Sequence, residues 1–156
     1  GQVLGALTHC ELPADLSITV VMGPTAPWLL RVHAQAKTMP CPTQVLVGVN
    51  NMAQLLAGSD LCIGAAGGSA LERCALGVPT LVLILAANQR SGAMALQSHD
   101  AAWIAADAQQ LKVQMSALFN KETQAVALQK MSQAAAKLAA GNGASQLVEL
   151  LLEPHV

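Results

Sequence analysis

The part of the sequence best suited to ligand chemistry is a run of small residues, 64–68, between a short apolar segment and Ser69. No side chain in this run is larger than a methyl group. We expect a helix to begin at Ser69, and the first turn of a helix offers unpaired N–H groups and the positive end of its dipole. Phosphates could therefore approach the backbone closely here. The run lacks the Lys of a Walker loop and the G-x-G-x-x-G spacing, so the pattern alone does not identify the ligand.

Ser69 and Glu72 allow two interpretations. In a capping box, the Ser69 side chain accepts a hydrogen bond from a first-turn N–H, and Glu72 reaches back to the N-cap N–H. In a binding site, Ser69 would face a phosphate. Glu72 would then accept hydrogen bonds from two neighbouring hydroxyls, as an acidic residue does for ribose in dinucleotide folds. Both arrangements can occur in one protein, in its free and bound states.

The segments that would position these residues alternate in type. Apolar or β-branched runs predict strands at 17–22, 44–47, 61–63, 80–85 and 102–105, and helical patterns lie at 26–37, 51–57, 69–76 and 89–98. Residues 80–85 are apolar at nearly every position, which indicates a strand covered on both faces and therefore parallel pairing. Gly77 is placed to end the helix 69–76 in a left-handed conformation. The sequence predicts an α/β fold, a doubly wound and mostly parallel, Rossmann-like sheet.

Helical patterns alone follow residue 107, at 109–119, 122–140 and 144–152. In the second of them an apolar stripe at helical spacing predicts a core-facing surface; it comprises Val126, Leu128, Met131, Ala135 and Leu138. We expect residues 1–156 to form a single domain, with 107–156 as a helical tail packed on it.

Composition excludes several classes of protein. Hydrophobic residues make up 53% of the 156 residues, charged residues 11%, and the net charge is −1, which argues against a disordered chain or a nucleic-acid-binding one. The longest apolar run, 81–87, is far shorter than the roughly 20 residues of a membrane span. The four cysteines have no C-x-x-C spacing, so we expect neither a metal site nor disulfides, and a cytoplasmic location.

Motifs along residues 51–89 carry a resemblance to a known family. They are Asn51-Met52-Ala53-x-Leu55-Leu56-Ala57, Ser59-Asp60-Leu61-Cys62-Ile63-Gly64-Ala65-Ala66-Gly67-Gly68-Ser69, Glu72-Arg73-Cys74, Leu76-Gly77-Val78-Pro79 and Ala87-Asn88-Gln89. With their surroundings, roughly residues 17–106, they resemble the C-terminal half of GT-B nucleotide-sugar proteins. The resemblance is greatest to the PseG-like UDP-sugar hydrolases of pseudaminic acid biosynthesis. It extends to MurG-like UDP-GlcNAc transferases, but the Glu-Arg-Cys and Asn-Gln elements favour the hydrolases.

The resemblance implies a UDP-sugar site. Its UDP-binding residues would be Val49, Met52, Gly67, Gly68, Ser69 and Glu72, and its sugar-binding residues would be Asn88 and Gln89. The glycine backbone and the serine hydroxyl would face the diphosphate, the glutamate would hold the ribose, and the Val49 backbone with the Met52 side chain would contact the uracil. Ordinary packing is the alternative for Met52, and loop polarity or helix capping for Asn88 and Gln89. Each set follows a predicted strand end, where open α/β sheets bind ligands.

The resemblance also implies what this chain lacks. In such proteins the catalytic His belongs to an N-terminal half, and the C-terminal half begins with a strand and a Gly-rich turn. We therefore expect this chain to be a fragment that lacks that N-terminal half and the first strand of the C-terminal half. None of its histidines, at 9, 33, 99 and 155, matches a catalytic position. We therefore expect the fragment alone to be inactive and to need no cofactor. Its partners would be a UDP-sugar and the N-terminal half of the same protein.

The function implied by the resemblance is hydrolysis of a nucleotide sugar. The full-length protein would act on UDP-2,4-diacetamido-2,4,6-trideoxy-β-L-altropyranose and release UDP and the free sugar. Two alternatives remain: the donor domain of a MurG-like glycosyltransferase, and a non-catalytic module that binds nucleotide sugars.

Overall fold

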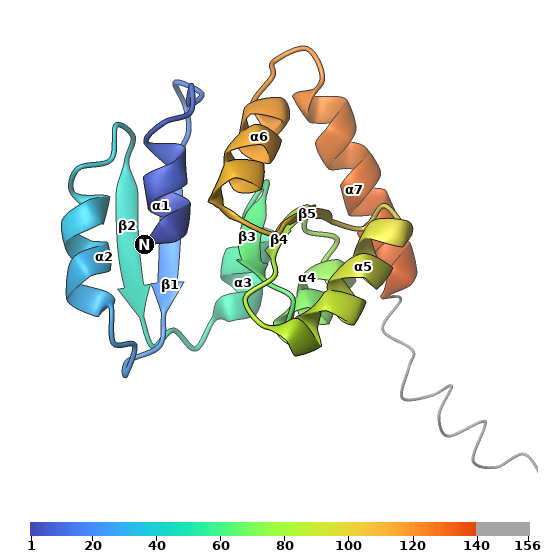
Figure 1. Cartoon of the computed structure of the whole chain (residues 1–156), viewed down its shortest axis with the longest axis horizontal. Coiled ribbons are helices and arrows are strands. Elements are labelled where there is room, and N and C mark those ends of the chain that lie inside the picture. The colour runs from blue at the N-terminus through green and yellow to red at the C-terminus, as the bar shows by residue number, and fades with distance from the viewer. Residues whose placement is uncertain (140–156) are drawn as a thin grey trace, which may run out of the picture.

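The computed structural model describes residues 1–139 (Figure 1). Its strands are β1 (Ile18–Met22), β2 (Thr43–Val47), β3 (Cys62–Ala65), β4 (Thr80–Leu83) and β5 (Trp103–Ala105). Its helices are α1 (Gln2–Leu7), α2 (Leu29–Ala36), α3 (Met52–Ala57), α4 (Ser69–Ala75), the short 3₁₀ helix η1 (Ala87–Gln89), α5 (Arg90–Ser98), α6 (Ala108–Leu118) and α7 (Gln124–Leu138). The alternation of strands and helices confirms the predicted α/β class. The helix predicted at 144–152 lies outside the described residues.

The strands are parallel but form two sheets. β1 pairs with β2, with Ile18 opposite Thr43, and β3, β4 and β5 form a three-stranded sheet with β4 in the centre. The carboxyl ends of β1 and β2 point to the same edge of the molecule, the lower one in Figure 1. The expected single sheet is thus interrupted, because no strand pairing joins β1 to β3 among residues 1–139.

β4 is covered on both faces, as the apolar run at 80–85 predicted. Leu81 is fully buried in a cluster with residues of α1, α6 and α7, among them Leu111 and Met131. Val82, which points to the opposite face, is fully buried in a second cluster with residues of α4 and α5, among them Cys74. The observed strand ends at Leu83, two residues earlier than predicted.

Local signals explain where two helices begin and end. Asp107 caps α6, because its Oδ1 accepts a hydrogen bond of 2.8 Å from the backbone N–H of Gln110. α4 ends at Ala75, and Gly77, which follows the C-cap Leu76, has the predicted left-handed conformation with a φ of 63°. There the N–H of Val78 bonds to the carbonyl of Arg73, which closes a Schellman motif.

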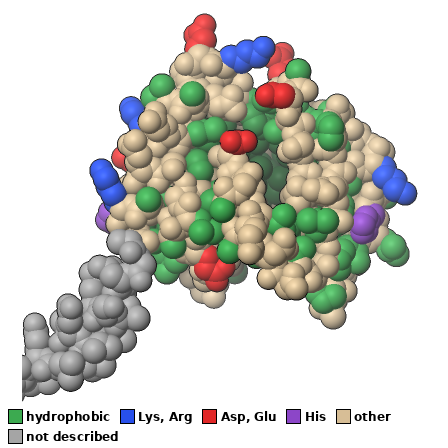
Figure 2. All heavy atoms as spheres, turned by 180° about the vertical axis from the view of Figure 1, so that it is seen from behind, with side chains coloured by type: hydrophobic (Ala, Val, Ile, Leu, Met, Phe, Trp, Pro, Cys, Tyr) green, Lys and Arg blue, Asp and Glu red, His purple; other side chains and the backbone are tan. Residues whose placement is uncertain are grey.

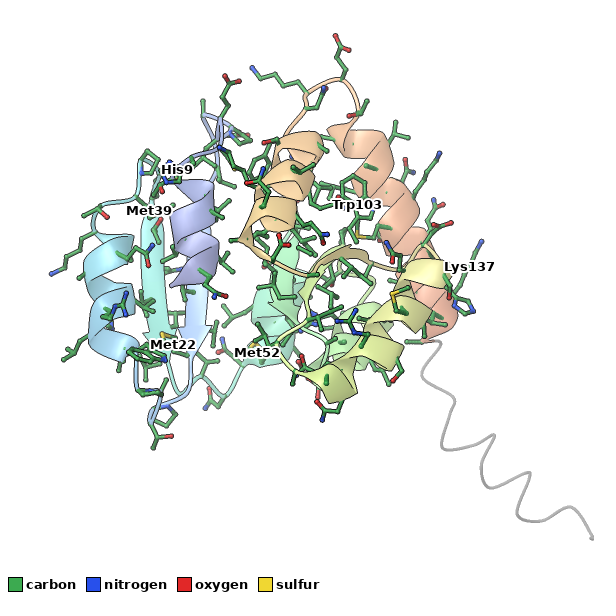
Figure 3. The ribbon with its side chains drawn as sticks, viewed as in Figure 1. His9, Met22, Met39, Met52, Trp103 and Lys137 are labelled. Atoms are coloured by element: carbon green, nitrogen blue, oxygen red, sulfur yellow. The ribbon has the colours of Figure 1, made fainter. Side chains whose placement is uncertain are left out.

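The tail helices α6 and α7 pack against other elements. α6 contacts α1 and β5, α7 contacts α4, and the Trp103 side chain lies between α6 and α7 (Figure 3). The predicted apolar stripe of α7 is only partly confirmed. Met131 and Ala135 are buried, but Val126 is 55% and Leu138 is 37% exposed. Within residues 1–139, no helix has both the length and the apolar character to cross a membrane.

Candidate nucleotide-sugar site

The run of small residues forms an open turn between β3 and α4. Gly67 and Gly68 are exposed, and a Cβ added to either would meet no atom within 4 Å. Their carbonyls accept hydrogen bonds from Ala70 and Leu71 of the first helical turn, at 2.9 and 3.2 Å. Neither glycine N–H has a backbone acceptor within residues 1–139. Two backbone donors are therefore available to a ligand beside the start of α4.

Ser69, the first residue of α4, is held by Arg73 one turn further along the helix. The Nη1 of Arg73 donates to the Ser69 Oγ at 3.1 Å, and its Nη2 donates to the carbonyl of Ala65 at 2.8 Å. A guanidinium can only donate, so the Ser69 oxygen must accept this bond. The hydroxyl proton of Ser69 is consequently free to be donated to an anion.

Arg73 carries a buried positive charge. Its side chain is only 4% exposed, and within residues 1–139 its Nε has no hydrogen-bond partner. The guanidinium lies against β3 at Gly64, where an added Cβ would come within 2.8 Å of Nη1. The glycine thus makes room for the charge. In the sequence Arg73 lies close to the predicted site. The direction of its side chain could not be predicted, because it depends on how α4 lies relative to β3.

The capping-box interpretation of Ser69 and Glu72 is wrong. The N-cap of α4 is Gly68, not Ser69, and no side chain caps this helix. Glu72 is exposed, and among the described residues its carboxylate makes no hydrogen bond. The ribose interpretation of Glu72 stays a prediction.

The predicted uracil contacts lie at the end of β2. Val49 is half-buried in the loop after this strand, and Met52, which begins α3, is 38% exposed. In Figure 3 Met52 lies at the same lower edge as Met22, which ends β1. Both residues are thus placed at the edge where the strands end, but their contact with a base stays a prediction.

The predicted sugar contacts lie in η1, after β4. Asn88 is exposed. The Oε1 of Gln89 accepts a hydrogen bond of 3.1 Å from the backbone N–H of Leu85, which closes the loop, and Gln89 does not cap α5 with its side chain. The oxygen of Gln89 is therefore engaged in the free protein, and its amide NH₂ is the part left for a ligand.

Two cysteines flank the buried guanidinium. Burial raises the pKa of the Cys62 and Cys74 thiols, and the nearby Arg73 charge partly opposes this effect at both. Raised pKa values keep both thiols neutral, so they are poor nucleophiles. Within residues 1–139, no three His, Cys, Asp or Glu residues are arranged to hold a metal ion.

Comparison with known proteins identifies the type of domain. Residues 3–150 match the family model described as the glycosyltransferase family 28 C-terminal domain. No curated protein matches the chain.

Solved structures share the fold. MurG from Acinetobacter baumannii superposes with a TM-score of 0.73 at 23% identity, over 97% of this chain and 45% of MurG. WaaG, a glycosyltransferase involved in lipopolysaccharide biosynthesis, superposes with a TM-score of 0.72 at 18% identity, over 98% of this chain and 43% of WaaG. The Streptomyces sp. SF2575 glycosyltransferase SsfS6, complexed with thymidine diphosphate, superposes with a TM-score of 0.53 at 13% identity, over 90% of this chain and 42% of SsfS6. This chain therefore spans less than half the length of each of these proteins.

Proposed function

Because the chain belongs to the glycosyltransferase family 28 C-terminal domain family, a nucleotide-sugar-binding domain of the GT-B type, we propose that it is the half of a larger enzyme that binds a UDP-sugar. The observation that carries this proposal is the arrangement of Arg73, Ser69 and the open glycine turn. It gathers a buried cation, a free hydroxyl proton and two free N–H groups at the end of β3. These groups suit the diphosphate of a nucleotide.

The electrostatics of Arg73 support an anionic ligand. A buried charge is costly unless it is compensated, and among the described residues no carboxylate forms an ion pair with Arg73. A diphosphate that accepts a hydrogen bond from the Ser69 hydroxyl would bring negative charge next to the guanidinium without touching it. As the glycosyl bond breaks, negative charge grows on the leaving diphosphate, and fixed donors of this kind stabilise it.

The other predicted residues complete the proposed site. Glu72 would accept hydrogen bonds from the ribose hydroxyls, and the Val49 backbone with the Met52 side chain would contact the uracil. Asn88 and the amide NH₂ of Gln89 would face the hexose. All of them belong to loops or helix starts that follow β2, β3 and β4.

For the reaction, we propose hydrolysis, as in PseG-like enzymes. Water would attack the anomeric carbon, the bond from this carbon to the phosphate oxygen would break, and UDP would leave with the electron pair. The sugar would be the trideoxy altropyranose named above, and the base would belong to an N-terminal half. The Glu-Arg-Cys and Asn-Gln elements support this choice. Sugar transfer in the manner of MurG is the second candidate, supported by the structural likeness to MurG.

Calorimetric titration of the 156-residue chain with UDP and with ADP tests the proposed site. We expect weak binding of UDP and weaker or no binding of ADP, since half of a two-domain cleft keeps the base and ribose contacts but cannot close. Ser69→Ala should weaken UDP binding roughly tenfold, the cost of one charge-assisted hydrogen bond. Ser98→Ala, a change at an exposed serine in α5, is the matched control and should have no effect. Equal affinities for UDP and ADP, or no heat with either, would contradict the proposal.

A second assay separates the reactions. The full-length protein should release UDP from the UDP-sugar in the absence of an acceptor if it is a hydrolase. Release that requires an added acceptor would identify a transferase, and tight binding without release would identify a non-catalytic module.

A further inference from the structure

The part of the fold around β1 and β2 differs in charge from the rest of the chain. Residues 16–59, which include β1, α2, β2 and α3, contain two cationic residues, Arg31 and Lys37, and no Asp or Glu. The remaining residues carry six cations against nine acids, so a net charge of +2 in this part stands against −3 elsewhere. The charge of the molecule is therefore unevenly distributed, and the positive part is the one that contains α2.

Two large apolar side chains are exposed at α2. Trp28, the N-cap of the helix, is 60% exposed, and Leu30 is 86% exposed, more than any other large hydrophobic residue within residues 1–139. The opposite side of α2 is buried at Val32 and Ala36, so the helix already packs on the core with another face. Trp28 and Leu30 are thus not needed for the fold described above.

The cations lie on the same exposed side of α2 as the apolar residues. Leu30, Ala34 and Lys37 follow one another at helical spacing, and all three are exposed. Arg31, also exposed, lies between this row and Trp28, and its Cζ is 5.5 Å from the centre of the Trp28 ring. We call these five residues the α2 face.

The α2 face lies at one end of the molecule. In Figure 1 α2 is the outermost element at the left, beyond β1 and β2. Seen from behind, in Figure 2, this end is at the right, where basic, histidine and hydrophobic side chains gather without an acidic one. An anionic surface would therefore attract this end of the molecule and repel the rest, which fixes the orientation of approach.

The charge and shape of the α2 face indicate what covers it. A second copy of the chain, related by a two-fold axis, would bring Arg31 and Lys37 close to the same cations of its partner, which is unfavourable. Leu30 protrudes from the helix, and a folded protein would need a matching pocket for it, whereas a lipid surface is fluid. Tryptophan and leucine combined with arginine and lysine are the side chains that helices lying on membranes present to lipid.

We propose that the α2 face docks on an anionic lipid surface. Trp28 and Leu30 enter the headgroup region, and Arg31 and Lys37 meet the lipid phosphates. α2 has eight residues and lies flat on the lipid without crossing it. With two cations and two apolar anchors the binding is weak and reversible. This inference does not depend on the proposed nucleotide-sugar ligand.

Binding of the 156-residue chain to lipid vesicles tests the proposal. The probes are vesicles of phosphatidylcholine alone and vesicles of equal parts phosphatidylcholine and phosphatidylglycerol. In a Trp103→Phe variant Trp28 is the only tryptophan, and its emission should shift to shorter wavelength with the anionic vesicles alone. Co-sedimentation of the unmodified chain should show the same preference, and high salt should abolish it.

A matched pair of variants locates the binding face. Leu30→Ser combined with Arg31→Ala removes one exposed apolar side chain and one exposed cation from α2. Lys112→Ala combined with Val113→Ser removes the same two kinds of group from α6, where both residues are exposed. We expect the α2 variant to bind anionic vesicles roughly tenfold more weakly or less still, and the α6 variant to bind like the parent.

Four results would overturn the proposal. The first is no binding to anionic vesicles, or equal binding to the two kinds of vesicle. The second is an equal loss of binding in the α2 and α6 variants. The third is a shift of the Trp28 emission with soluble poly-glutamate and none with vesicles, which would assign the α2 face to an acidic protein. The last is a shift that grows with protein concentration in the absence of vesicles, which would assign it to a second copy.

Discussion

Arg73 is the residue on which the candidate site depends most. It is almost fully buried, yet it fixes the Ser69 oxygen as an acceptor and places a positive charge beside it. Two residues make this possible: Gly64, which leaves room for the guanidinium, and Ala65, whose carbonyl accepts its second bond. An arginine that acts in this way positions the binding group and does not itself touch the ligand.

Gly64→Ala should uncouple this arrangement. The new Cβ would meet Nη1 at 2.8 Å and displace a buried guanidinium, so we expect a loss of about 1–3 kcal/mol in the free energy of unfolding and weaker UDP binding. Gly92→Ala in α5, where no atom lies within 4 Å, is the control and should raise stability by up to about 1 kcal/mol. Denaturant unfolding and UDP titration measure both effects. A Gly64→Ala protein as stable as the parent would show that the Arg73 side chain can adopt another position without loss of stability.

The variant Glu72→Gln tests whether Glu72 binds the ribose of the nucleotide. Because the carboxylate is exposed and makes no hydrogen bond within residues 1–139, the melting temperature should change little. Loss of charge-assisted bonds to the diol costs about 1.5–3 kcal/mol, so UDP should bind roughly ten- to a hundredfold more weakly while uracil binding is unchanged. Glu122→Gln, between α6 and α7, is the control. Unchanged UDP affinity in Glu72→Gln would remove this residue from the site.

Much of the candidate site could be predicted at the level of residue position. The small residues, Ser69 and the loops after β2 and β4 lie where parallel strands end, as expected. The direction of Arg73 could not be predicted, because it depends on how α4 crosses β3. The bond from Leu85 to Gln89 was also missed, since a side chain that closes its own loop has no periodic signal.

At the scale of elements, α6 connects the two sheets. It contacts α1 on one side and β5 on the other, and its buried side chains Leu111, Met115 and Leu118 contribute to the larger core cluster. The cap at Asp107 sets where this helix begins, directly after β5. Its start therefore determines which side chains of α6 reach the core.

Asp107→Ala should destabilise the protein through this helix. The loss of the bond to the Gln110 N–H leaves a helix-start donor without its side-chain acceptor, which costs about 1 kcal/mol. Asp107→Asn keeps an acceptor oxygen and should lose much less. Thermal or urea unfolding of the two variants checks this order, and equal stabilities would show that the cap contributes nothing.

The elements themselves were largely predictable, because strand and helix periods differ and glycine marks ends such as Gly77. The predictions that failed did so because they depend on tertiary packing. Val126 and Leu138 have the spacing of a core stripe, but they line an open pocket beside Trp103 and Met131 and stay partly exposed. The division into two sheets does not follow from the pattern of 17–22 or 61–63, which does not say which strand lies beside which. Only the absence of a first strand, which the resemblance implied, bore on it.

At the scale of the whole molecule, the buried thiols link stability to pH. Burial raises the pKa of Cys62 and Cys74 in the folded protein above the ordinary value of about 8.5. Their contribution is therefore complete below about pH 8.5 and is lost as the pH rises, because the unfolded chain ionises first. The free energy of unfolding should fall more steeply between about pH 8 and 10 in the parent than in a Cys62→Ala, Cys74→Ala variant. A Cys10→Ala, Cys41→Ala variant is the control, and equal slopes in all three proteins would contradict the expectation.

The larger core cluster has a consequence for synthesis on the ribosome. It joins Leu4, Leu7 and the inner face of β1 to Leu81, Leu111 and Met131. At about 5–20 residues per second, Met131 is added roughly 6–23 seconds after Ile18. During that interval the apolar side chains of β1 have only the early part of this cluster to pack against, which includes Leu4, Leu7 and Val32. The side chains of β1 are therefore made well before the α6 and α7 residues that complete their cover.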